Sequence, residues 1–305
     1  MLQILADGLI MGSIIALGAI GLSMTLSIVR FSNFSHGELL GWGAYLALVA
    51  STVLNAMQAT LAENVGPFSF GWGLMLGLLL ACVLTALLAL ALDRILFKRL
   101  RKQGSITLVI ASFGAALALR NLLLFWQGGI PRYYSDNLQI AMVLVPRSVG
   151  GGLRVTPDQL FVLTLTMVTV TGLHLFLRHS TLGRSMRATA LNPALARVTG
   201  IDPERVLRAT WLIGGVLAAI AGVFAGLTVQ MRPTMGVDLL LPLFAAVILG
   251  GVGSIWGAVL GGFIVGLSES VAVTLVGAEY RAAAAFVVLI AILMLRPRGL
   301  FGEAH

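Results

Sequence analysis

Apolar residues form long runs that are separated by short polar stretches along almost the whole chain. Most of these runs reach the roughly 20 residues that an α-helix needs to cross the hydrocarbon core of a bilayer. The runs lack the strict alternation of barrel strands, so they predict membrane-spanning helices. We expect spans near residues 4–29, 70–92, 105–126, 158–177, 209–230, 255–276 and 282–295, with another that ends near residue 57.

Two of the apolar stretches are interrupted. Polar residues crowd the early interruption between Ser32 and Glu38, and glycines dominate the late one at 250–253. Non-helical backbone at membrane depth is tolerated only where protein buries it or where it lines a cavity. The pattern therefore predicts an all-α, polytopic transmembrane helical bundle of about eight or nine membrane segments with broken helices. The number depends on whether the short segment that begins at Leu239 crosses fully or is re-entrant.

Composition and charge agree with a membrane protein. Of 305 residues, 58% are hydrophobic and only 10% are charged, too few to cover a soluble globule of this size. The net charge of +8 could suggest nucleic acid, but the basic residues are divided among short loops, and topology explains them better. Fourteen of the 20 Lys and Arg residues fall on one side, which predicts an N-terminus outside and a cytoplasmic C-terminus. No Lys or Arg precedes the first apolar run, so we expect this run to stay as the first span.

The longest polar passage is residues 178–208, which carries six arginines against two acidic residues. Asn192-Pro193 and Asp202-Pro203 each combine a helix N-cap with a proline at the first helical position. Gly200 stands where a helix should end, so we expect a short helix near 193–199. One side of this helix carries Leu191, Leu195 and Val198. We interpret the passage as a cytoplasmic coupling loop whose helix fits the groove of a soluble partner.

Residues for catalysis or metal binding are sparse. The four histidines are scattered, the single cysteine, Cys82, permits no internal disulfide, and no metal-binding motif is present. His36 and Glu38 should point to different faces of a helix, so we do not expect them to bind a metal as a pair. For His36 itself, a buried structural histidine is a simpler interpretation than a substrate ligand. Glu269, inside a span, is either functional or paired with Arg281 or Arg120. We therefore expect no catalytic residue, no metal and no cofactor.

The chain also lacks the means to hydrolyse ATP. It has only two lysines, Lys98 and Lys102, and neither lies in a phosphate-binding GxxxxGK[ST] loop. Any hydrolysis of ATP must therefore come from another polypeptide.

Four stretches, at 33–45, 181–202, 244–262 and 296–302, resemble the permease subunits of branched-chain amino-acid ABC transporters and their relatives for urea, amides and other amino acids. The resemblance implies one transmembrane permease domain, 1–305, with a cytoplasmic coupling loop, 178–208, in a bacterial inner membrane. It also implies a second permease subunit, paralogue or self, two cytosolic ATP-binding subunits and a periplasmic substrate-binding protein.

The resemblance assigns two sets of residues. The ATPase-coupling set comprises Gly183, Arg187, Ala188, Asn192, Ala196, Gly200 and Ile201. The candidates for the substrate path are Asn33, His36, Gly37, Glu38, Gly250, Gly251, Gly253 and Glu269. A departure from the family pattern, Ser35 where relatives often have alanine, leaves the assignment intact.

Three other functions stay open at this point. A permease for urea or short amides would share the same architecture. A passive channel or a secondary transporter can also contain broken helices and buried charge, but it has no need of a coupling loop. An intramembrane enzyme would need a nucleophile with a base, or a metal site, and the sequence offers neither.

Overall fold

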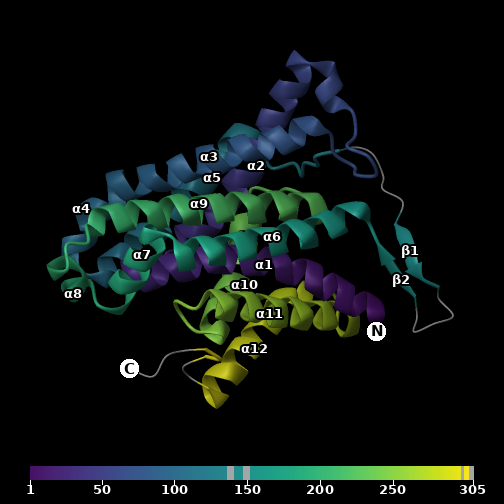
Figure 1. The fold of residues 1–305 in the computed structure, drawn as a ribbon. Helices are drawn as coiled ribbons and strands as arrows, with labels where there is room; N and C mark the ends of the chain where they lie inside the picture. The colour runs from purple at the N-terminus through teal and green to yellow at the C-terminus, as the bar shows by residue number, and fades with distance from the viewer. Residues whose placement is uncertain (136–140, 147–151, 297–298, 302–305) are drawn as a thin grey trace.

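The computed structural model describes residues 1–135, 141–146, 152–296 and 299–301. Within this part, eight helices are long and apolar enough to cross a membrane, and they run side by side as a bundle (Figure 1). They are α1 (Leu2–Val29), α2 (Ser35–Met57), α3 (Trp72–Leu92) with the turns that continue it to Gln103, α5 (Ser105–Gln127), α6 (Pro157–His179), α9 (Pro203–Thr228), α11 (Ile255–Leu275), and α12 (Arg281–Leu295) with the 3₁₀ turn that starts at Ala278. The all-α polytopic bundle expected from the sequence is confirmed.

A ninth apolar helix, α10 (Met235–Gly250), is shorter. At 1.5 Å per residue its 16 residues span about 24 Å, less than a hydrocarbon core. It follows α9 and ends at Gly250, because the next residue, Gly251, has a φ of 94° outside the helical region. This helix is the segment by which the counts of eight and nine differ.

The helices α1 and α9 form the centre of the bundle. In their most apolar windows, 83% of α1 and 78% of α9 are buried, against 6% for α12. Small residues allow the close packing: a Cβ on Gly12 would lie 2.7 Å from the ring of Phe263, and one on Gly215 would lie 2.7 Å from Cα of Ala86. The peripheral helices turn most of their apolar surface outward, toward lipid or another subunit.

Short elements complete the two ends. A π-helical turn (Asp93–Phe97), α4 (Lys98–Leu100) and a 3₁₀ turn (Arg101–Gln103) extend α3, while 3₁₀ turns also occur at Ala59–Ala62 and Ala278–Tyr280. The strands β1 (Met142–Val145) and β2 (Leu153–Val155) pair antiparallel near the start of α1, at the end of the bundle opposite α8 (Figure 1). The helices α7 (Thr181–Leu191) and α8 (Pro193–Val198) lie at that opposite end.

Side-chain caps explain where several of these helices start. Asn192 Oδ1 accepts hydrogen bonds from the backbone N–H groups of Ala194 and Leu195, and Asp202 accepts one from Glu204 N–H. Both caps were expected from the sequence. Ser180 caps α7 through Gly183 N–H, and this helix was not expected.

The early interruption is shorter than expected. The non-helical residues are Arg30 to Phe34, with Arg30 in the left-handed region at a φ of 63°. His36, Gly37 and Glu38 lie in the first turns of α2 rather than in the break itself. The late interruption lies where it was expected, between Gly250 and Ile255.

Candidate functional site

The helices α7 and α8, here called the α7–α8 unit (residues 181–198), are folded by the residues that the sequence singled out for coupling. Gly183 packs directly on the backbone of Leu177, and a side chain there would collide with it. Arg187 donates a hydrogen bond to the carbonyl oxygen of Leu177. These two contacts hold α7 against the end of α6.

The other coupling residues set the turn after α8. Ala196 is buried, and its carbonyl oxygen accepts a hydrogen bond from Ile201 N–H at 3.0 Å. Gly200 takes a φ of 84°, which ends the helix in the manner of a glycine C-terminal motif. Ala188 is half-buried on α7. Arg187, Asn192 and Gly200 are exposed, so the seven predicted residues both shape the unit and form part of its outer surface.

The outer surface of the unit is apolar. Leu191 and Leu195 are about equally exposed, at 60% and 61%, and Val198 is 85% exposed. Leu195 and Val198 stand three residues apart on one side of α8, whereas Leu191 ends α7 before the extended residue Asn192. An exposed apolar row on a capped polar segment is typical of a surface that another protein covers.

A pocket connects this unit to the late break. The inner pocket, with a volume of about 270 Å³, lies between α1, α6, α7 and α11 and has Arg187, His174, Trp256 and Gly253 among its lining residues. Gly253 N–H donates a hydrogen bond to Ser23 Oγ at 2.9 Å. The α7–α8 unit and the late break thus share one cavity wall.

Backbone packing builds the late break. A side chain on Gly250 would collide with the backbone of Gly257, and Gly251 and Gly253 have φ angles of 94° and 89° that favour glycine. The segment after α12 also joins here, because Leu300 N–H donates to Leu249 O at 2.8 Å and Phe301 N–H donates to Gly250 O at 3.1 Å. This tail therefore satisfies carbonyl groups in the last turn of α10.

Polar side chains build the early break. Asn33 Oδ1 accepts hydrogen bonds from Ser35 N–H at 3.1 Å and from Ser35 Oγ at 2.7 Å. His36 Nε2 lies 3.1 Å from Gly18 O, so the ring is tied to the backbone of α1. All three side chains are buried.

Glu38 is the buried charge of this region. Its Oε1 lies 3.5 Å from Arg120 Nε on α5, and only 1% of its side chain is exposed. Next to it, Gly37 packs against the backbone of Gly236 at the start of α10. Arg120, a candidate partner of Glu269, thus pairs with Glu38 and ties α5 to α2.

Glu269 lies apart from both breaks. It is buried on α11, and neither carboxylate oxygen has a hydrogen-bond partner in the described part of the chain. Arg281 acts on it electrostatically, although the two form no ion pair within the described ranges. The predicted path residues therefore lie in three separate regions. The first is the early break with the first turns of α2, beside the start of α10. The second is the late break at the end of α10, and the third is Glu269 on α11.

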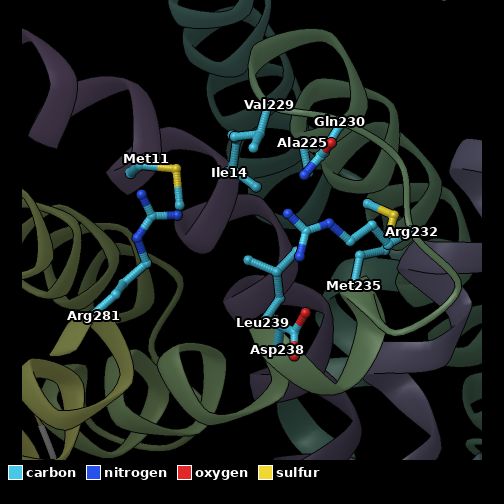
Figure 2. A pocket seen from close by; sticks show the side chains of 10 residues that line it. All are labelled: Met11, Ile14, Ala225, Val229, Gln230, Arg232, Met235, Asp238, Leu239 and Arg281. Atoms are coloured by element: carbon cyan, nitrogen blue, oxygen red, sulfur yellow. The ribbon is translucent and has the colours of Figure 1, made fainter. Parts of the chain in front are cut away.

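A second pocket, here called the outer pocket, contains charged residues that sequence analysis gave no role in binding. It has a volume of about 160 Å³ and lies between α1, the end of α9, the start of α10 and the start of α12 (Figure 2). Its lining residues are Met11, Ile14, Ala225, Val229, Gln230, Arg232, Met235, Asp238, Leu239 and Arg281. Asp238 and Arg232 are close in sequence and flank the start of α10. Their spacing does not predict that Arg281 lines the same pocket.

In the described residues, no group of three His, Cys, Asp or Glu side chains is placed to hold a metal ion. The polar groups of the outer pocket suit an organic ion better, because two guanidinium groups and one carboxylate can bind opposite charges on one ligand.

Comparisons with known proteins agree with this architecture. The family described as branched-chain amino acid transport system / permease component matches residues 4–295. The high-affinity branched-chain amino acid transport system permease protein BraD of Pseudomonas aeruginosa is 31% identical over 303 residues, covering 99% of this chain and 96% of the relative. The corresponding LivH of Escherichia coli K12 is 29% identical over 307 residues, with the same coverage. A probable LivH of Methanocaldococcus jannaschii is 28% identical, covering 98% of this chain and 92% of that protein.

Proposed function

We propose that this chain, which belongs to the family of branched-chain amino acid transport system permease components, carries branched-chain amino acids through the inner membrane as a subunit of an ATP-binding-cassette importer. The family match over residues 4–295 is the observation that supports this function. The chain is a transport subunit and makes no covalent change in its substrate. Two cytosolic ATP-binding subunits hydrolyse ATP, and a periplasmic binding protein delivers the substrate. A second permease subunit, a paralogue or a second copy, completes the membrane path.

The α7–α8 unit is the contact with the ATP-binding subunits. Its exposed apolar side chains, Leu195 and Val198 on α8 and Leu191 at the end of α7, support this role, because capped helices with apolar faces fit grooves of soluble partners. Gly183 and Arg187 hold the unit against the end of α6, so a displacement of the unit would move the end of α6 with it. The shared wall of the inner pocket then passes the motion to Gly253 and the end of α10.

The N-terminus lies outside and the C-terminus in the cytoplasm. The excess of Lys and Arg at the α7–α8 end supports this orientation. The helix α10 runs in the same direction as α1, from the outer pocket beside Met11 and Ile14 to Gly253 beside Ser23 and Ser27. With α10 counted, nine segments connect opposite sides of the membrane.

Uptake of labelled leucine, with urea as comparator, tests the function. The complete complex, reconstituted in vesicles with its binding protein, should take up leucine only when ATP is supplied to the ATP-binding subunits. Val198→Asp should reduce this uptake about ten-fold or more and should release the ATP-binding subunits on purification, because a charge then faces the apolar groove. Thr181→Asp, also exposed but at the far end of α7, is the matched control and should keep both properties.

Two results would contradict the proposal. Leucine uptake that continues without the ATP-binding subunits would make the chain a channel or secondary transporter. Uptake of urea without uptake of leucine would keep the ATP-driven mechanism and replace the substrate.

A further inference from the structure

We propose that the outer pocket is this chain's own binding site for a zwitterionic α-amino acid, with Arg232 and Arg281 binding the carboxylate and Asp238 binding the ammonium group. The inference rests on the proposed import function, and it identifies which part of the substrate this chain recognises.

The geometry of the pocket brings three distant segments together. Arg232 precedes α10, Asp238 lies in the first turn of α10, and Arg281 is the first residue of α12. Figure 2 shows the side chains of Arg232 and Arg281 reaching into the pocket from opposite sides, with Asp238 below Arg232. A small ligand between them would therefore meet positive charge on two sides and one carboxylate.

The three charged side chains of the outer pocket are free to bind a ligand. Among the described residues, neither Arg232, Arg281 nor Asp238 takes part in an ion pair with another side chain. Within the described ranges, the one hydrogen bond to the Asp238 carboxylate is long, 3.5 Å, and comes from Thr234 Oγ1. Arg232 donates hydrogen bonds to the neutral side-chain amide of Gln230. Arg281 attracts Glu269 electrostatically, but the two side chains are too far apart for an ion pair. Charge-assisted hydrogen bonds to a ligand are therefore available at all three side chains.

The remaining wall of the pocket suits an apolar side chain. Met11, Ile14 and Leu239 face the same space as the charged groups. Methionine adapts to different hydrocarbon shapes because it is unbranched and flexible. A cavity of about 150 Å³ holds benzene, so the roughly 160 Å³ here can hold the hydrocarbon part of leucine or valine.

The position of the pocket also fits a transport step. The start of α10 forms its floor, and Gly236 there is packed on Gly37 of α2. The other end of α10 is the late break, which borders the inner pocket. A ligand bound at the outer pocket thus contacts the helix that ends beside the α7–α8 unit.

This chemistry separates amino acids from the neutral substrates of related permeases. Urea and amides carry no carboxylate, so they would form no charge-paired hydrogen bonds with the guanidinium groups of Arg232 and Arg281. Leucinamide lacks the carboxylate, and 4-methylpentanoate lacks the ammonium group. Leucine should occupy the pocket better than either.

A cysteine-protection experiment on the assembled complex tests the site directly. Cys82→Ala removes the only native cysteine, and Val229→Cys then places one thiol in the outer pocket. Leucine should slow labelling of this thiol by a membrane-impermeant maleimide, and leucinamide or 4-methylpentanoate should need concentrations at least ten-fold higher. A thiol at Thr60→Cys, exposed but outside the pocket, should react at the same rate with and without leucine.

The charged residues are tested in the same background. Arg232→Gln, Arg281→Gln and Asp238→Asn should each raise the leucine concentration for half-protection about 10- to 100-fold, the effect of losing a charged hydrogen bond. Arg281→Lys should lose less, because it keeps the charge. Arg154→Gln, an exposed arginine of β2 outside this pocket, should change nothing.

The outcomes separate this site from the proposed function. Equal protection by all three ligands, or protection unchanged in the charge variants, would overturn the site even if the unmodified complex imports leucine with ATP. Charge variants that weaken docking of the binding protein but leave leucine protection intact would also overturn it, because the pocket would then be part of a protein interface. If the unmodified complex shows no ATP-driven leucine uptake, the proposed import function, on which this inference rests, is wrong.

Discussion

The early and late breaks interrupt membrane helices by different chemistry. At the early break, polar side chains contact one another: Asn33 Oδ1 accepts two hydrogen bonds from Ser35, and Glu38 forms an ion pair with Arg120. At the late break, backbone lies against backbone, and glycines at 250 and 257 make the approach possible. The first depends on electrostatics in a low-dielectric interior, and the second depends on the absence of side-chain atoms.

One helix, α10, connects the surroundings of the two breaks. Gly236, at the start of α10, packs on Gly37 in the first turn of α2, just after the early break, and Gly250 ends α10 at the late break. A short helix held at one end by a charged neighbourhood and at the other by close backbone contacts can tilt without losing its own hydrogen bonds. We therefore expect substitutions at the two ends to act by different means, and the following changes measure the difference.

The largest effect is expected from Arg120→Leu. This change leaves Glu38 buried without a counter-charge, and breaking a buried pair typically costs about 3–5 kcal/mol. The free energy of unfolding in a detergent titration measures the loss. Stability unchanged within about 1 kcal/mol would show that Glu38 is held by something other than this pair.

A double substitution sharpens that result. Glu38→Gln removes the charge that Arg120→Leu strands, so the double variant should recover a large part of the stability lost in Arg120→Leu. Simple addition of the two single effects would mean that the two residues act independently.

The sequence predicted the bundle and the late break because those features are local. Apolar runs determine the spans, and the glycines at 250–253 mark a stop within one run. The short helix α8 was predicted for the same reason, since Asn192 caps it from the adjacent position.

The rest depends on contacts between distant segments. Arg120 was considered, with Arg281, as a partner of Glu269 and not of Glu38, because the sequence does not tell which helices are neighbours. The helix α7 was missed because its cap is Ser180, a common residue that gives a weak signal. The outer pocket combines Arg232 with Arg281, 49 positions apart, and only the fold brings them to one cavity.

A smaller effect is expected from Gly250→Ala at the late break. The added methyl group would collide with the backbone of Gly257, and overpacking of this kind costs about 1–3 kcal/mol. Gly114→Ala is the matched control, because a Cβ on Gly114 of α5 meets no atom within 4 Å. The control should be neutral or slightly stabilising, as alanine favours helix over glycine by about 0.5–1 kcal/mol. Equal unfolding free energies for the two variants would contradict close packing at 250.

The smallest effect is expected from Ser23→Ala, which removes the acceptor of the hydrogen bond from Gly253 N–H. A typical hydrogen bond contributes about 0.5–1.5 kcal/mol, and the loss should appear as a small decrease in the free energy of unfolding. Ser27→Ala, one turn further along α1, is the control, because its hydroxyl donates only within its own helix, to Met24 O. If Ser23 serves mainly to hold the late break beside the α7–α8 unit, ATP-driven uptake should decrease more than stability does. An equal response of Ser23→Ala and Ser27→Ala in both measurements would show that the late break keeps its position through glycine packing alone.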